Sequence, residues 1–137
     1  MGAMRKKISL AFTAGCIGGL LNGLIVWLFG VMEITTAIGV KISPALTPPM
    51  LYQRIVWGGL WGLVFLLPFM QEHIMRKGLI LSLGPTMVQL FIVFPLKAQK
   101  GFMGLELGAL TPLCVLFFNA VWGLAAALWL RRTETMG

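Results

Sequence analysis

The sequence has few charged residues and almost no acidic ones. Only 11% of its 137 residues are charged, with four Asp and Glu in total and a single histidine, whereas an ordinary soluble domain carries about 25% charged residues. Apolar residues make up 58% of the chain, and the mean hydropathy is +0.91. A soluble domain of this length could not bury so much apolar surface. The composition therefore predicts a single domain, residues 1–137, embedded in a lipid bilayer.

Cysteine is also scarce. Cys16 and Cys114 are the two cysteines, and they are too few and too far apart in the expected topology to form a disulfide framework. The nine methionines are scattered and have no Cys or His grouped beside them at ligand spacing, so copper binding is not indicated. We expect no metal and no cofactor.

Titratable side chains are missing from the middle of the long apolar stretches, which contain no central Asp, Glu, Lys or His. Proton-coupled transporters generally need such a group inside the membrane, so a proton-driven exporter is not expected. No nucleophile and base stand together as a pair, and the single histidine, His73, follows Glu72 in a short polar turn. We therefore expect a protein that is not an enzyme.

The sequence does contain apolar stretches long enough to cross a hydrocarbon core of about 30 Å as helices. They cover residues 8–32, 48–70, 78–95 and 112–130. Only helices suit them, because unpaired backbone groups are costly in lipid and the alternation of a barrel strand is missing. We expect an all-α, polytopic membrane protein with four transmembrane helices in an antiparallel bundle.

The basic residues gather at the ends of these stretches and do not line one polar face, so nucleic acid is not an expected partner. Seven lie at one end of the bundle: Arg5, Lys6, Lys7, Arg76, Lys77, Arg131 and Arg132. Four lie toward the other: Lys41, Arg54, Lys97 and Lys100. By the positive-inside rule, this excess predicts that both termini are cytoplasmic.

The sequence contains an approximate internal repeat. The run ALTPPML at 45–51 leads into VWG at 56–58, and ALTPLCV at 109–115 leads into VWG at 121–123. The repeat predicts a duplicated two-helix hairpin with halves at 8–70 and 78–130, related by an axis along the membrane normal. In each half the threonine is expected to cap a helix whose first residue is proline. The alternative is that Thr-Pro and Trp-Gly are simply common in membrane helices.

Small residues recur on one face of each expected helix. These strips consist of Ala11, Gly15, Gly19 and Gly23; Gly58 and Gly62; Gly78, Ser82 and Thr86; and Asn119, Gly123 and Ala127. Such strips let helix backbones approach closely in lipid. Either all of them are used within one chain, or at least one is shared in a homodimer. The Gly84-Pro85 pair is expected to kink the third helix.

The candidate binding site centres on Arg54. This residue lies about 10 Å from the outer end of its helix, Asn119 is its equivalent in the repeat, and Gln89 reaches a similar depth. Asn22 lies somewhat deeper. We expect these four side chains to form an outward-opening polar pocket with Tyr52 and Gln53 near its rim. A guanidinium with no carboxylate nearby in the sequence favours an anion, either a lipid phosphate or a carboxylate.

A less specific interpretation stays open for these residues. Arg54 could extend to the membrane surface, or pair with Glu33 or Glu106 at the outer helix ends. The three amides would then serve only as interhelical hydrogen bonds, worth about 0.6 kcal/mol each.

The C-terminal third contains the runs QLF at 89–91, FPL at 94–96, LTP at 110–112 and VW at 121–122. These runs resemble the YagU-type family of uncharacterised bacterial inner-membrane proteins. The chain departs from the family pattern by an insertion at 97–107. The resemblance implies a multi-pass protein of the bacterial inner membrane, and it assigns no functional residues.

These observations favour a non-catalytic membrane protein that binds a lipid head group or a partner membrane protein through the outer polar cluster. The alternative is a small channel or facilitator for an anion or neutral solute, formed along the bundle axis or at a dimer axis. An enzyme acting on lipid head groups has the least support. The expected partners are the bilayer, an anionic lipid, and a second copy or another membrane protein.

Overall fold

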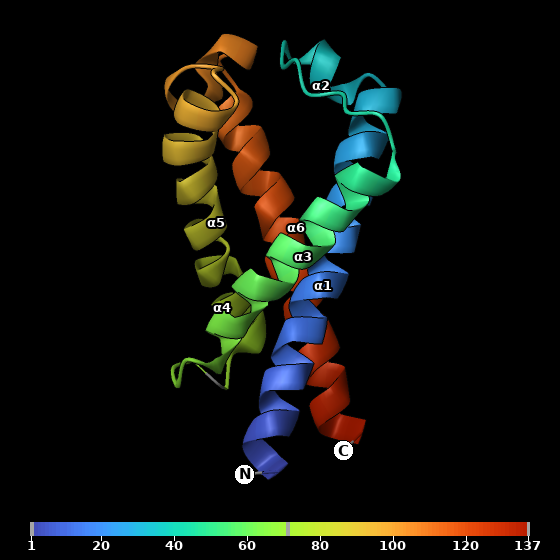
Figure 1. The fold of residues 1–137 in the computed structure, drawn as a ribbon, viewed down its shortest axis with the longest axis vertical. Coiled ribbons are helices and arrows are strands. Elements are labelled where there is room, and N and C mark those ends of the chain that lie inside the picture. The colour runs from blue at the N-terminus through green and yellow to red at the C-terminus, as the bar shows by residue number, and fades with distance from the viewer. Residues whose placement is uncertain (1, 71, 137) are drawn as a thin grey trace.

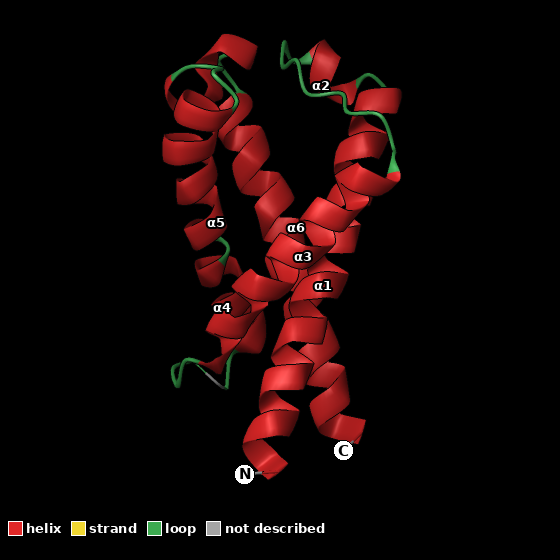
Figure 2. Cartoon of the chain, in the orientation of Figure 1, coloured by secondary structure: helices red, strands yellow, loops and turns green. Residues whose placement is uncertain are grey.

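The computed structural model describes residues 2–70 and 72–136, with the side chains of 134–136 outside the description. Its helical elements are α1 (Gly2–Val31), α2 (Ile34–Ala37), α3 (Pro48–Gly62), the 3-10 helix η1 (Leu63–Leu66), α4 (Ile74–Leu81), α5 (Leu83–Val88), the π-helix η2 (Gln89–Lys97), the 3-10 helix η3 (Phe102–Leu107) and α6 (Thr111–Met136). The described residues contain no strand (Figure 2). The all-α expectation is confirmed.

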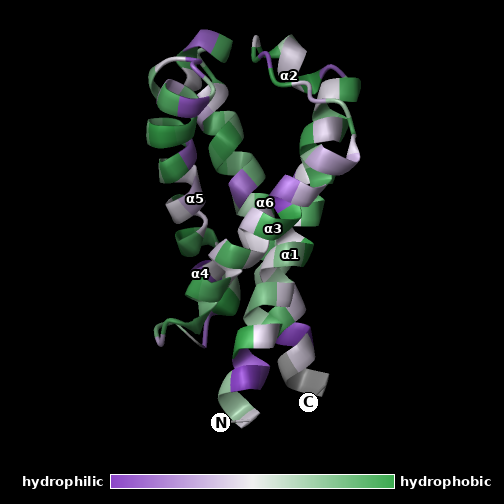
Figure 3. Ribbon diagram, in the orientation of Figure 1, coloured by the Kyte–Doolittle hydropathy of each residue, from purple (hydrophilic) through white to green (hydrophobic). Residues whose placement is uncertain are grey.

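Three helical stretches are long and apolar enough to cross a membrane: Gly2–Val31, Ile74–Lys97 and Thr111–Thr133. The chain is thus compatible with a multi-pass membrane protein, and hydrophobic residues cover most of these helices (Figure 3). The segment expected at 48–70 is shorter. Its α-helix ends at Gly62 and η1 ends at Leu66, so the fourth crossing stays a prediction.

The long segments alternate in direction along the chain. Helix α1 leads away from the N-terminus, α3 returns, α4, α5 and η2 lead away again, and α6 returns (Figure 1). The two termini therefore lie at the same end of the molecule, and α2 and η3 lie at the other. Helix α1 packs mainly against α3 and α6, and α6 also packs against α4.

Glycines set two close helix crossings. Where α1 meets α3, a methyl group added at Gly58 would lie 2.7 Å from the carbonyl oxygen of Gly15. Where α4 meets α6, a methyl group added at Gly123 would collide with the carbonyl group of Gly78. Helices in lipid associate through such close contacts because burial against lipid tails offers little driving force. Each crossing therefore uses two of the expected small-residue strips, one from each helix.

The two tryptophans of the repeated VWG motif have different surroundings. Trp122 is 3% exposed, and its indole N–H lies 3.2 Å from the Gly15 carbonyl oxygen and 3.3 Å from that of Gly58. It therefore links α6 to the α1–α3 crossing. Trp57 is 60% exposed. In a membrane that side chain would face lipid.

The threonine caps also differ. The Thr47 hydroxyl accepts a hydrogen bond of 3.3 Å from the Met50 amide, and Pro48 is the first residue of α3, as expected. The Thr111 hydroxyl is buried and has no hydrogen-bond partner among the described residues. The expected cap is therefore absent at Thr111, whose own amide donates to the Gly108 carbonyl at 3.2 Å.

The third long segment is irregular. α4 ends at Leu81 and α5 begins at Leu83, so the helix is interrupted near the expected Gly84-Pro85 kink. Pro85 has no N–H to donate to the preceding turn, which accounts for the interruption. From Gln89 the chain continues as a π-helix that contains Pro95. π-Helical turns are rare and frequently occur at functional sites.

Lys77 lies inside the fold, although the sequence suggested a basic residue flanking the membrane. It is 1% exposed. Its Nζ donates to the carbonyl oxygens of Phe65 at 2.8 Å and Leu67 at 2.6 Å, and lies 5.3 Å from the Phe69 ring centroid. The ammonium group thus satisfies carbonyl groups at and just beyond the end of η1, which helix hydrogen bonding leaves free.

Candidate functional site

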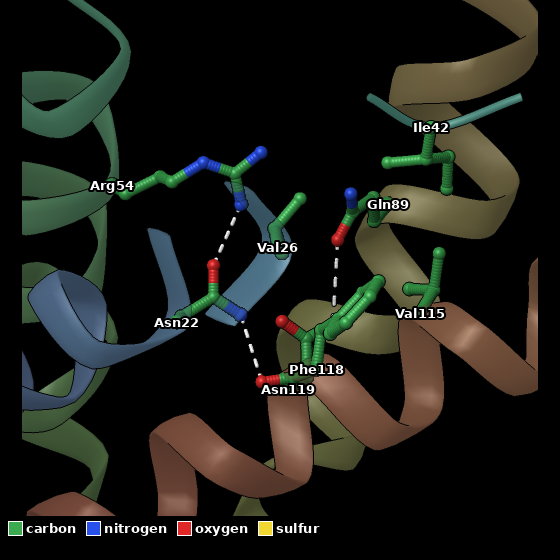
Figure 4. Close-up of a pocket in the computed structure, with 8 residues that line it drawn as sticks. All are labelled: Asn22, Val26, Ile42, Arg54, Gln89, Val115, Phe118 and Asn119. Carbon is green, nitrogen blue, oxygen red and sulfur yellow. Dashed lines mark hydrogen bonds between the residues drawn. The ribbon is translucent and has the colours of Figure 1, made fainter. Parts of the chain in front are cut away.

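One cavity brings together the four polar residues identified in the sequence. Asn22 comes from α1, Arg54 from α3, Gln89 from η2 and Asn119 from α6 (Figure 4). The apolar side chains that line the same cavity are Val26, Ile42, Val115 and Phe118. Tyr52 and Gln53, expected near the rim, are exposed on α3 and do not line it. The structure thus brings the four residues together at one cavity, and their role in binding stays a prediction.

Asn22 holds the Arg54 guanidinium in place. Its Nδ2 donates to the Phe118 carbonyl oxygen at 2.8 Å, and its Oδ1 accepts from Arg54 Nη1 at 2.6 Å. A carbonyl only accepts and a guanidinium only donates, so these two partners leave one orientation for the Asn22 amide. Arg54 has no other partner among the described residues. Its Nε and Nη2 therefore keep free N–H groups.

A second chain of hydrogen bonds orients Gln89. The Thr86 hydroxyl donates to the Ser82 carbonyl at 2.8 Å, so its oxygen is left to accept from Asn119 Nδ2 at 3.1 Å. Asn119 Nδ2 also donates to Gln89 Oε1 at 3.3 Å. The Gln89 Nε2 group has no partner among the described residues, and Gln89 lines the cavity.

Arg54 does not pair with the carboxylates considered from the sequence. Glu33 and Glu106 are exposed, and within the described part of the chain Arg54 forms no ion pair with either. Its guanidinium instead contacts Asn22, which is only 7% exposed. The guanidinium is therefore held against α1 by this contact.

The cavity is small, with a volume of about 20 Å³. This is room for one water molecule, since a water needs at least about 10–15 Å³ and two or more polar partners. The lining residues offer one positive charge and several amide groups, but no carboxylate, hydroxyl, thiol or imidazole. The arrangement can bind a hydrogen-bond acceptor, and it supplies no base or nucleophile.

A second hollow, of about 320 Å³, lies in the turn before α4. Its lining includes Glu72 and His73, both exposed. Across the described residues, no three His, Cys, Asp or Glu side chains come together in a group that could hold a metal ion. Of these two hollows, the Arg54 cavity is the one that combines side chains from α1, α3, η2 and α6.

Sequence reasoning missed two contributors to the site. Thr86 orients Asn119, and the main-chain carbonyl of Phe118 orients Asn22. Thr86 stands three residues before Gln89, a spacing that puts both on one helix face, so the sequence carried a usable signal for it. A backbone carbonyl carries no such signal.

No protein family, characterised protein or solved structure matches the chain. The resemblance to the YagU-type family therefore stays a prediction, and the function is argued from the geometry of this chain.

Proposed function

We propose that the protein is a non-catalytic integral membrane protein that binds an anionic lipid head group through Asn22, Arg54, Gln89 and Asn119. One observation supports the proposal: Arg54 and Gln89 line the same cavity, and each keeps N–H donors that have no partner among the described residues. No carboxylate neutralises the guanidinium among the described residues. A guanidinium is well suited to phosphate because its N–H groups form a planar fork.

The membrane topology belongs to the same proposal. The chain crosses the bilayer four times, both termini are cytoplasmic, and the membrane is the bacterial inner membrane. The three apolar helices and the alternating directions of the long segments support a chain that crosses the bilayer several times (Figure 1). The larger group of basic residues supports the orientation. Arg54 then belongs to the outer half of the bilayer, where it meets head groups of the outer leaflet.

We also propose that the chain is a duplicated hairpin. The α1–α3 and α4–α6 crossings support this, because they use Gly58 and Gly123, which are equivalent in the repeat. One helical turn before each glycine stands the polar residue of that half, Arg54 or Asn119. The cavity then lies between the two halves, and each half supplies an equivalent position.

A channel or facilitator has less support. Passage of a solute needs a continuous polar path, whereas the cavity has a volume of about 20 Å³. Apolar clusters border it, one containing Val26 and Phe118 and another containing Val115 and Phe94. Binding of a single polar group fits these surroundings better than passage.

Native mass spectrometry of the protein in mild detergent tests the proposal. The wild type is expected to retain an anionic lipid that Arg54→Gln loses. Lys97→Gln is the matched control, because it removes the same charge from an exposed side chain outside the cavity. Equal lipid retention by all three proteins would overturn the proposal. Loss of a second protein subunit, and not of lipid, from Arg54→Gln would replace the lipid with a protein partner.

A further inference from the structure

We propose that this site distinguishes phosphate groups by their charge, taking a singly charged phosphodiester and rejecting a doubly charged phosphomonoester. The inference rests on the proposed function, and it names the class of head group that the site accepts.

The residues that line the cavity carry a single charge. Arg54 is the only charged side chain among the residues that line the cavity, and the other polar groups there are neutral amides. One guanidinium balances one negative charge. A second negative charge at the same place would be left without a partner in a medium of low dielectric constant, which is strongly unfavourable.

The other cations expected at this end of the protein lie outside the cavity. Lys41, Lys97 and Lys100 are all exposed, and none of them lines the cavity. Exposed charges are screened by water and salt. They can attract any anion to this end of the protein, but they cannot balance a second charge inside the cavity.

The cavity is too small to hold a whole phosphate group. Its volume of about 20 Å³ corresponds to roughly one water-sized atom. A phosphate can therefore place one unesterified oxygen in the cavity, beside Arg54 and Gln89, while its other unesterified oxygen stays at the cavity mouth, where no other lining residue carries a charge. Phosphodiesters and phosphomonoesters both have such an oxygen. The size of the cavity therefore does not distinguish phosphodiesters from phosphomonoesters, but their charge does.

The experiment uses the full chain in nanodiscs of phosphatidylcholine that contain equal small fractions of phosphatidylglycerol and phosphatidic acid. Retained lipid is counted by mass spectrometry after mild release. A phosphomonoester has a second pKa of about 6, so phosphatidic acid is mostly doubly charged at about pH 8 and singly charged at about pH 5. Phosphatidylglycerol carries one charge at both values.

We expect phosphatidylglycerol to be retained about tenfold better than phosphatidic acid at about pH 8, and the ratio to fall below about threefold at about pH 5. Equal retention of phosphatidylglycerol and phosphatidic acid at about pH 8, with both lipids lost in Arg54→Gln, would overturn the proposed selection by charge. The proposed function would then still stand. Enrichment of neither lipid over phosphatidylcholine would overturn both.

A soluble phosphodiester offers the same chemistry as the lipid. Adding glycerophosphoglycerol, the free head group, separates the two sources. We expect no displacement of phosphatidylglycerol at equal concentration, because the acyl chains hold the lipid beside the site. Displacement would place the ligand in solution and overturn the assignment to a lipid.

Discussion

Asn22 Oδ1 accepts a hydrogen bond of 2.6 Å from Arg54 Nη1, although the two residues are on different helices. Since Asn22 is in turn fixed by the Phe118 carbonyl, the bond joins α1, α3 and α6 in one chain of contacts. The bond occupies Nη1 of the guanidinium and leaves the Nε and Nη2 groups free. Asn22 thus acts as a positioning residue for the charge at the proposed site.

Replacing Asn22 with leucine tests this positioning role. Asn22→Leu keeps a similar size but leaves the Arg54 N–H and the buried Phe118 carbonyl without their partner. We expect the free energy of unfolding to fall by about 1–3 kcal/mol, measured by denaturant titration in detergent, together with weaker lipid retention. Thr13→Val is the control on the same helix, since the Thr13 hydroxyl bonds only within its own turn. A larger loss of stability in that control would contradict this assignment.

Gln89→Glu is expected to abolish lipid retention while the fold is kept. Its carboxylate has the shape of the amide, can still accept from Asn119, and adds a negative charge to the cavity that Arg54 lines. It would neutralise the guanidinium in place of the ligand. The measurement is lipid retention by native mass spectrometry, with circular dichroism as the check on folding. Undiminished retention by a folded variant would show that Arg54 does not hold the ligand.

Lys77→Met is expected to destabilise the protein without changing lipid binding. The substitution leaves the Phe65 and Leu67 carbonyl oxygens without the ammonium group that they accept from, at a cost of about 1–3 kcal/mol. Arg76→Gln, at the exposed neighbouring position, should change stability by less than about 0.5 kcal/mol. Thermal unfolding of both variants in the same detergent makes the comparison. An equal effect at the two positions would refute the structural role of Lys77.

The parts of the fold that could be predicted from sequence are those set by local patterns. Apolar length predicted the helical class, and position along each helix predicted that Asn22, Arg54, Gln89 and Asn119 would meet. The burial of Lys77 could not be predicted. It depends on where the preceding turn brings two free carbonyl groups, which is a tertiary contact.

The same limit applies to the irregular parts. Thr47 and Thr111 stand in the same sequence context, yet only Thr47 caps its helix. The π-helix that begins at Gln89 also has no simple sequence signal beyond Pro95. The volume of the cavity depends on how the side chains that line it pack together, so the sequence could indicate a pocket but not its size.

Alanine substitutions at Gly58 and Gly123 test whether the two crossings are equivalent, as the proposed duplication requires. In Gly58→Ala the new methyl group would lie 2.7 Å from the Gly15 carbonyl oxygen, and in Gly123→Ala it would meet the Gly78 carbonyl group. Because backbone atoms cannot move aside as a flexible side chain can, each variant should lose about 1–3 kcal/mol of stability. Gly2→Ala, with open space around it, should be near neutral. A large loss of stability at only one of the two crossings would argue that they are not equivalent. The repeated motif would then reflect only that Thr-Pro and Trp-Gly are common in membrane helices.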